Sequence, residues 1–532
     1  MTDVALRPAG RRPEPAREAN TGQPDRAAQL FTVVLGLVVA AAVVIRFTAT
    51  QSLWLDEAQS VAISRLPLHG AGTTLFDGLR QDGSPPLYYL LLHVWMELFG
   101  TSTSAVRAMS ATLNIVTAWP LFVLARRVVG PLAARVTVLL YLTSPFALYF
   151  ATETRMYSLI VLLAACGGLA LERVLHAPSP RSVLALGVCA AGVALTHYWS
   201  LYLLLTVGLW LVLVTIRPRP GWGTRGPIAA FGGLCIGAVI FAVWLPEFAF
   251  QMKHTGTPWG DPASFAAVAH AYGQWAGGPT TMGRLLLLLI TGLAAAGIAG
   301  QAVDGRHILI DLRGREPGRT LFFLATLTLV IAVAAGQLVG NAWADRYTAT
   351  AFVPFLLVIG LGATRLAKAR TFRAVVALAA VIGLLAGAQE VWKERTQAGQ
   401  AGSTLGRLAL PGDVLLVCPD QLGPGLSRTV PAGVRVHVVP TYAGPDRVDW
   451  VDYSDRNLAA NGTEIADRAL AEAGPGHTVF MAGSGSYQTF ETLCTEVRGE
   501  LQNRRPNADE VMKQADPSQV TSESYALLRF RP

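Results

Sequence analysis

Residues 30–45 read LFTVVLGLVVAAAVVI, and the acidic motif WLDEAQS follows at residues 54–60. As a helix, an apolar run of this kind with its flanks crosses roughly 30 Å of hydrocarbon. No convincing cleavage site follows the run, so we interpret it as an uncleaved membrane anchor. The carboxylates of Asp56 and Glu57 then lie just beyond the end of the first membrane span.

Similar apolar windows recur along the 532-residue chain. Hydrophobic residues make up 52% and charged residues 15% of the sequence, and the mean hydropathy is +0.41. This composition predicts an all-α polytopic membrane protein. The net charge of +8 would also suit nucleic acid. However, Arg and Lys cluster in short segments between the apolar runs, which is typical of orientation in a membrane, so we expect no nucleic acid partner.

We predict about eleven transmembrane helices within residues 28–390. Arg and Lys concentrate in every second connecting segment, which places the N-terminus in the cytoplasm by the positive-inside rule. Pro86–Phe99 is short for a span, and counting it would invert every later loop, so we interpret it as an interfacial or re-entrant helix. The predicted spans lie near residues 29–49, 105–125, 132–150, 157–173, 182–198, 199–216, 227–246, 283–300, 320–338, 348–366 and 372–388.

Two further parts flank this transmembrane module. Residues 1–27 are rich in Pro, Ala and Arg and are predicted to form a disordered basic cytoplasmic arm. Residues 391–532 emerge outside and alternate strand-like with helix-like stretches, which predicts a soluble extracytoplasmic α/β domain. The strand-like runs are 413–418, 434–439, 477–482 and 525–530, and the helix-like stretches lie near 456–473 and 487–503. Cys418 and Cys494 there either form a disulfide or remain unpaired thiols.

Polar residues gather on the predicted outer side, in the first outer loop 50–104 and in later loops. Ionisable groups at membrane depth are costly, so their convergence on one side indicates a functional site. Each one alone has an ordinary interpretation, such as a helix cap, a loop ion pair or an aromatic interface belt. The set consists of Asp56, Glu57, Asp82, Tyr88, Glu153, Arg155, Tyr157, His197, Lys253, His254, Arg346 and Tyr347.

Together these motifs resemble the GT-C membrane glycosyltransferases of the protein O-mannosyltransferase and lipid A aminoarabinose transferase type. Asp56-Glu57-Ala58, then Pro85-Pro86-Leu87-Tyr88-Tyr89 and Leu98-Phe99-Gly100, then Arg107 follow the family order over roughly residues 30 to 130. The segment 153–157 resembles the second outer loop of these enzymes, and Arg346-Tyr347 their late-loop motif. The Ala-, Arg- and Gly-rich composition is similar to that of actinobacterial cell-envelope enzymes.

The resemblance implies transfer of a sugar, with mannose or arabinose favoured, from a polyprenyl-phosphate donor. The acceptor would be a cell-envelope glycan, glycolipid or protein at the outer face of the cell membrane. A carboxylate that takes the acceptor hydroxyl's proton suits Asp56, with Glu57 in support. The leaving lipid phosphate needs cations, and Arg346 is the first choice. The expected helpers at the phosphate are Arg155, Lys253 and Tyr347, and the expected sugar or acceptor contacts are Glu153, Tyr157, His197, Asp82, Tyr88 and His254.

Metal dependence and two other function classes stay open at this point. Glu153 could bind a divalent cation such as Mg²⁺ or Mn²⁺, or a sugar hydroxyl, and no Asp-x-Asp pair favours the metal. A lipid-linked sugar flippase would also need outer charges, but should carry polar residues near the midplane or inverted repeats, which the sequence lacks. A scaffold or receptor built around the exported domain would have no use for the acidic pair.

Overall fold

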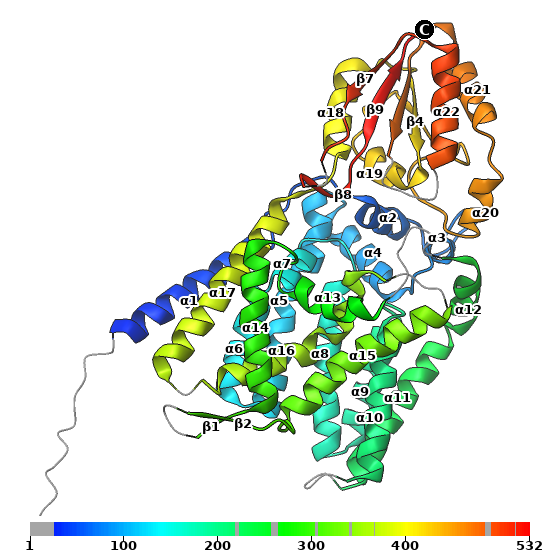
Figure 1. The fold of residues 1–532 in the computed structure, drawn as a ribbon. Helices are drawn as coiled ribbons and strands as arrows, with labels where there is room; N and C mark the ends of the chain where they lie inside the picture. Colours follow the sequence, from blue (N-terminus) through cyan, green and yellow to red (C-terminus); the bar gives the residue numbers. More distant parts are fainter. Residues whose placement is uncertain are drawn as a thin grey trace, which may run out of the picture.

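The computed structural model describes residues 26–218, 223–256, 264–303, 307–339, 343–366, 368–484, 491–516 and 518–532. A bundle of helices carries an α/β domain at one end (Figure 1). The predicted basic arm at residues 1–27 lies outside the described residues except for its last two, which begin the first helix.

Each predicted span coincides with a helix of the bundle, or with a pair of helices in one case. Seven described helices are long and apolar enough to cross a membrane, and the bent pair α6 and α7 makes up to eight. Since α9, α10 and the apolar part of α1 (Gln29–Ile45) are shorter than these, the count of eleven stays a prediction. The helices are α1 (Arg26–Ile45), α5 (Thr103–Val128), α6 (Pro131–Thr143), α7 (Pro145–Ala151), α8 (Tyr157–His176), α9 (Pro180–Ala194), α10 (Ser200–Ile216), α11 (Arg225–Ala242), α14 (Thr281–Ala299), α15 (Gly318–Val339), α16 (Ala349–Ala363) and α17 (Ala369–Trp392).

The span predicted at residues 132–150 is two helices, α6 and α7, which meet at 55°. Pro145 causes the break, because proline lacks a backbone N–H and disfavours helical geometry in the residue before it. Ser144 is accordingly extended, and its hydroxyl accepts the Ala147 N–H to cap α7. The turn brings the end of α7 and the following residues 152–156 to the end of the bundle that carries the α/β domain.

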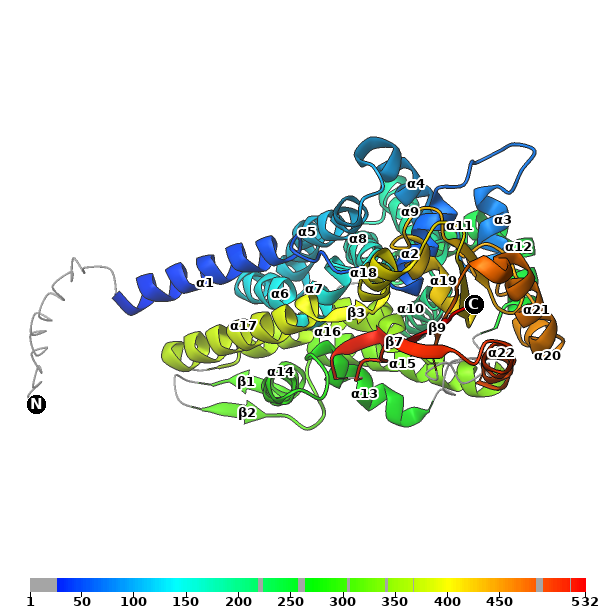
Figure 2. The ribbon, with the colours of Figure 1, turned by 90° about the horizontal axis from the view of Figure 1, so that it is seen from above.

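Helix α16 lies at the centre of the bundle, and nearly all of its side chains are buried. It packs closely on α14, where a Cβ added to Gly362 would lie 1.7 Å from the carbonyl oxygen of Leu293. Small residues of this kind let membrane helices approach backbone to backbone. Helix α1 instead lies at the edge of the bundle beside α17 (Figures 1 and 2). The fixed position of α16 holds the short 3₁₀ helix that precedes it, η1 (Asp345–Thr348).

Several short helices pack around the end of the bundle that faces the α/β domain (Figure 1). Helix α4 corresponds to the predicted interfacial segment 86–99, and its 13 residues are short for a span. Helix α2 packs on α3, on α4 and on the α/β domain. The short helices are α2 (Leu55–Ser64), α3 (Leu75–Asp82), α4 (Leu87–Phe99), α12 (Leu245–His254) and α13 (Phe265–Trp275), with a two-stranded hairpin, β1 (Gly300–Ala302) and β2 (Ile308–Ile310), elsewhere in the bundle.

The α/β domain is a five-stranded sheet in the order β5-β4-β6-β9-β7, covered by helices on both faces. The first three strands are parallel, and β9 and β7 join them antiparallel. Leu416 of β4 packs with α21 and α22, whereas Leu415 and Val417 pack with α18 and α19, as strand alternation requires. The strands are β4 (Val414–Cys418), β5 (Arg435–Val438), β6 (Val479–Gly483), β7 (Ala508–Met512) and β9 (Ala526–Phe530), and the helices are α18 (Ala398–Leu408), α19 (Gly423–Ser427), α20 (Tyr453–Leu458), α21 (Gly462–Ala473) and α22 (Glu491–Arg504).

The sequence located four of these strands and missed β7, whose polar residues Asp509 and Glu510 hide the apolar pattern of an edge strand. The single helix predicted near 456–473 is two, α20 and α21. Asn461 separates them by capping α21, since its side chain accepts the Glu464 N–H. A second, very short pairing joins β3 (Glu394–Thr396) after α17 to β8 (Val520–Glu523), where the domain meets the bundle.

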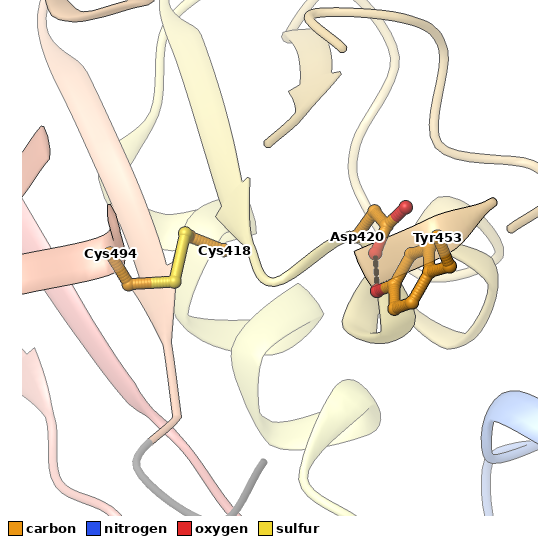
Figure 3. Close-up of a disulfide and its surroundings, with 4 residues drawn as sticks. All are labelled: Cys418, Asp420, Tyr453 and Cys494. Atoms are coloured by element: carbon orange, nitrogen blue, oxygen red, sulfur yellow. Dashed lines mark hydrogen bonds between the residues drawn. A yellow bond between two sulfur atoms is a disulfide. The ribbon is translucent and has the colours of Figure 1, made fainter. Parts of the chain in front are cut away.

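Cys418 at the end of β4 and Cys494 of α22 form a disulfide (Figure 3). The bond closes a loop with a sequence separation of 76 residues. By loop-closure entropy, a cross-link of that length stabilises the fold by about 4 kcal/mol.

Replacing both cysteines by serine should therefore loosen the α/β domain within the full-length protein. We expect limited proteolysis to cut the Cys418→Ser/Cys494→Ser variant within residues 391–532 at least tenfold faster than the parent protein. Cys235→Ser, at an exposed free cysteine, is the matched control. Equal cleavage rates for the double variant and its parent would contradict the prediction.

Candidate active site

The acidic pair stands in the first turn of α2, where the helix dipole favours carboxylates. The backbone N–H of Leu55, the first residue of α2, donates to Oε1 of Glu523 at 2.8 Å. Glu523 belongs to β8, more than 450 residues further along the chain. The α/β domain therefore holds the start of the helix that carries Asp56.

Asp56 lies between two arginines that the sequence predicted for the same site. Its Oδ2 atom is 3.7 Å from Nε of Arg155 and 3.5 Å from Nη2 of Arg346. The Asp56 side chain is 15% exposed. Among the described residues, that same Oδ2 atom has no hydrogen-bond donor. The structure thus joins residues from α2, the 152–156 loop and η1 around one carboxylate, whose Oδ2 atom can still accept a hydrogen bond.

Both arginines are held by further contacts. Arg155 donates from Nη1 to Oγ of Ser60 at 3.0 Å, one helical turn beyond Asp56. Burial alone would lower the pKa of Arg155, but the Asp56 carboxylate raises it above its ordinary value. The guanidinium carbon of Arg346 lies 5.7 Å from the ring centre of Trp54 and 5.5 Å from that of Tyr347. Both cations stay charged and are preorganised for an anion.

Glu57, predicted to support Asp56, does not face this site but points into the protein. Its side chain is fully buried and accepts two hydrogen bonds from Arg107, at 2.8 and 2.6 Å. Nη1 of Arg395 lies 3.4 Å away, and the N–H of Thr154 donates at 2.9 Å. Burial would raise the pKa of Glu57, but Arg107 and Arg395 lower it. Glu57 therefore positions α2 against α5, β3 and the 152–156 loop.

Glu153 is also buried, close behind Asp56. Its Oε1 atom accepts a hydrogen bond from the indole of Trp54 at 3.1 Å, and within the described chain its Oε2 atom has no hydrogen-bond partner. Burial raises the pKa of Glu153 to about 7. No group of three or more His, Cys, Asp or Glu side chains in the described parts is arranged to hold a metal ion. A cation at Glu153 would need ligands from substrate or water, and it stays a prediction.

The raised pKa of Glu153 predicts a pH effect on stability. The carboxyl has an ordinary pKa of 4.5 and a folded-state pKa of about 7, so its contribution to stability is complete below pH 4.5 and is lost as the pH rises toward 7. Glu153→Gln removes this loss. We expect the variant to raise the thermal midpoint over that of the parent protein by more at pH 8 than at pH 5. An equal difference at the two pH values would contradict it.

An aromatic cluster forms one side of the site. The ring of His197 lies 4.8 Å from that of Tyr347 and 6.0 Å from that of Tyr157. Burial, with the nearby Arg155 and Arg346, lowers the pKa of His197 to about 3, so its ring is neutral. Within the described residues the buried hydroxyl of Tyr157 has no hydrogen-bond partner. These three predicted residues thus lie together, and the guanidinium group of Arg346 is near the Tyr347 ring.

Asp82 and Tyr88 support the site from behind, which corrects their prediction as sugar contacts. The hydroxyl of Tyr89 donates to Oδ2 of Asp82 at 2.6 Å, and Nε2 of Gln59 donates to Oδ1 at 3.2 Å. Protein donors thus occupy both carboxylate oxygens. Tyr88 is fully buried on α4. Asp82 and Tyr88 therefore lie on the side of α2 that packs against α3 and α4, and not beside the first turn of α2, which carries Asp56.

Lys253 and His254 lie apart from Asp56. This corrects the prediction of Lys253 as a helper at the phosphate and of His254 as a sugar or acceptor contact. Both stand at the end of α12, which packs on α3. Lys253 is exposed, and Nδ1 of His254 lies 3.0 Å from the carboxylate of Asp452 in the α/β domain. The alternation of inner and outer loops along the chain predicted the correct end of the bundle for them. It carries no information on where a loop lies within the plane of the membrane.

The sequence reasoning missed Trp54, Arg395 and Glu523 as parts of the site. Arg395 offered a signal in the sequence, since an arginine shortly after the last predicted span lies on the predicted outer side, against the positive-inside rule. It lies 3.4 Å from Glu57 and donates to the carbonyl of Thr152 at 2.9 Å. Glu523 offered none, because only the fold of the α/β domain brings it to α2.

Comparison with known proteins bears on both the sequence and the fold. Residues 83–246 match the family described as dolichyl-phosphate-mannose-protein mannosyltransferase. ArnT from Cupriavidus metallidurans in the apo state is similar with a TM-score of 0.56 at 15% identity, and ArnT bound to undecaprenyl phosphate with 0.55 at 14%. Both comparisons cover 94% of this chain and 98% of ArnT. No curated protein matches the sequence. The family resemblance inferred from the sequence is confirmed.

Proposed function

We propose that this chain, which has the GT-C fold of membrane glycosyltransferases, moves a sugar from a polyprenyl-phosphate donor to a hydroxyl acceptor. The reaction takes place at the outer face of the cell membrane. The observation that carries the proposal is the Asp56 carboxylate between Arg155 and Arg346. One group can accept a proton there, and two can neutralise a phosphate.

The reaction needs the Asp56 carboxylate and the two arginines at the same time. The acceptor oxygen attacks the anomeric carbon and forms the new C–O bond while Asp56 takes its proton. The bond from the anomeric carbon to the phosphate oxygen breaks, and its electron pair leaves with the lipid phosphate. Arg346 and Arg155 stabilise that charge through guanidinium hydrogen bonds. Attack from the face opposite the phosphate inverts the anomeric configuration.

The choice of substrates follows from the resemblance and from the site together. The family match over residues 83–246 favours mannose as the sugar, and the likeness of composition to actinobacterial enzymes favours arabinose. Tyr157, Tyr347 and the neutral His197 supply uncharged hydrogen-bonding groups for sugar hydroxyls. The acceptor is a cell-envelope glycan, glycolipid or protein. The α/β domain would stand outside the membrane, on the side from which this acceptor arrives.

The experiment uses purified full-length protein in nanodiscs with radiolabelled decaprenyl-phosphate mannose or arabinose and an envelope-glycan extract. We expect label to move to the extract with one of the two donors. Arg346→Gln should lower the rate by about 10²- to 10³-fold, as loss of one preorganised donor at a developing charge does. Arg498→Gln, at an exposed arginine of α22, is the matched control. Lipid-sugar translocation across vesicles without any transfer would instead identify a flippase.

A further inference from the structure

A polar pocket of about 650 Å³ opens between α2 and the α/β domain. Helix α2 contributes Ala58 and Ala62, and Arg65 follows directly at its C-terminal cap, so the three lie at helical spacing along one face. The domain closes the pocket from the other side with α19 and with the segment 441–449 that follows β5. The small side chains of Ala58 and Ala62 leave room for the pocket, and charged side chains surround it.

Three arginines of this pocket form no salt bridge with a described residue, although the charge of Arg447 contributes to lowering the pKa of Asp77. Arg65, Arg428 and Arg447 line it, and within the described parts of the chain none of them forms a salt bridge. Burial, with Arg65 nearby, lowers the pKa of Arg428, so the cations act on one another. Nη1 of Arg447 is buried and has no hydrogen-bond partner among the described residues. An anionic group in the pocket would relieve the repulsion between Arg65 and Arg428 and accept charge-assisted hydrogen bonds from the guanidinium groups that line it.

The rest of the lining suits hydroxyl groups. Asp420 is 5% exposed, and one of its carboxylate oxygens accepts the hydroxyl of Tyr453 while the other points away from it (Figure 3). Gln81, Ser427 and Thr441 also line the pocket and add amide and hydroxyl groups. A carboxylate, an amide and hydroxyls around one space can accept from and donate to several sugar hydroxyls at once.

A chain of hydrogen bonds joins this pocket to Asp56 across α2. The backbone of Val448, beside the lining residues Arg447 and Asp449, both donates to and accepts from the side chain of Gln59, at 2.9 and 2.8 Å. Gln59 in turn donates to Asp82 at 3.2 Å.

From Asp82 the chain continues to the cations of the active site. Tyr89 donates to Asp82 at 2.6 Å, and Nη1 of Arg155 donates to the Tyr89 hydroxyl at 3.4 Å. Arg155 itself faces Asp56. Pocket and reacting groups thus lie on opposite faces of one short helix and share one polar network.

We propose that this pocket binds an anionic saccharide segment of the acceptor, with the arginines on its phosphate or carboxylate and Asp420 on its hydroxyls. The proposal that the ligand is an acceptor rests on the proposed function. The pocket holds a part of the glycan that lies away from the reacting hydroxyl, and so selects charged acceptors without taking part in the chemistry.

The test is a binding titration that requires no transfer. Mannose 6-phosphate, mannose and inorganic phosphate are titrated separately into full-length protein in nanodiscs. We expect mannose 6-phosphate to bind at least tenfold more tightly than either of the other two. Arg65→Gln/Arg447→Gln should weaken that binding at least tenfold, whereas Arg498→Gln and Arg346→Gln should not change it.

Each other outcome overturns part or all of the proposal. Equal binding to the parent protein and the Arg65→Gln/Arg447→Gln variant overturns the site. Loss of binding only in Arg346→Gln assigns the anion to the active site instead. If mannose binds as tightly as mannose 6-phosphate, the pocket does not require a charged ligand. If inorganic phosphate binds as tightly as mannose 6-phosphate, the pocket does not recognise the saccharide. Because none of these readings depends on turnover, failure of the proposed function would leave them intact.

Discussion

Asp56→Asn is expected to lower kcat for sugar transfer by about 10²- to 10⁴-fold, the usual contribution of a general base. Asparagine preserves the shape of the side chain but cannot take the acceptor's proton. The affinity for the donor should change little, because Arg155 and Arg346 remain to bind its phosphate. The measurement is single-turnover transfer of labelled sugar at saturating donor and acceptor, with the parent protein beside the variant.

Two controls separate a chemical effect of Asp56→Asn from a structural one. Asp455→Asn makes the same exchange at an exposed position of α20 and should leave transfer unchanged. The size-exclusion profile and thermal midpoint of Asp56→Asn should match those of the parent, since the Asp56 side chain is partly exposed. Transfer at the parental rate by a correctly folded Asp56→Asn protein would remove Asp56 from the mechanism.

Glu57→Gln is expected to damage the fold and not only the chemistry. Glu57 is fully buried and compensates the charges of Arg107 and Arg395. Removing one partner from a buried ion pair typically costs about 3 to 5 kcal/mol, because the remaining charges lose their compensation. We therefore expect a clearly lower thermal midpoint and a larger aggregated fraction, measured by size exclusion after heating.

The comparison with neighbouring and distant acids makes this expectation specific. Glu57→Asp keeps the charge and should recover part of the lost stability, and Glu510→Gln, at an exposed position of β7, should have no effect. Adjacent positions thus give opposite results: Asp56→Asn retains stability and loses turnover, whereas Glu57→Gln loses stability first. A parental thermal midpoint for Glu57→Gln would show that the buried pair contributes little.

The adjacent acids Asp56 and Glu57 illustrate how far pattern reasoning reaches. Both follow the first span, so both were predicted on the outer side, with Asp56 as the base and Glu57 in support, but the sequence does not show which side chain faces the site. Successive residues on a helix point about 100° apart, so one carboxylate faces the opening and the other faces the interior. Which one faces the opening depends on the helices and the domain packed around α2.

The other predicted site residues also fall into two groups, those that lie at the site and those that share only the same end of the bundle. The structure brings together Arg155, Arg346, Tyr157, His197 and Tyr347, because each follows or precedes a span at the same end of the bundle, and their roles in the reaction stay a prediction. Lys253 and His254 satisfied the same rule but lie along α3. Loop parity orders residues along the membrane normal and leaves their positions within the plane open.

Apolar run length and charge distribution were enough to predict a helical membrane protein with its polar residues gathered at one end, because the hydrocarbon thickness and the cost of charge in it act on local sequence. The site itself depends on contacts between distant segments. Glu523 holds α2, Arg395 compensates Glu57, and the pocket forms between α2 and α19. Such contacts arise only when the α/β domain packs on the bundle, since packing and buried charge compensation act between residues that no sequence period relates.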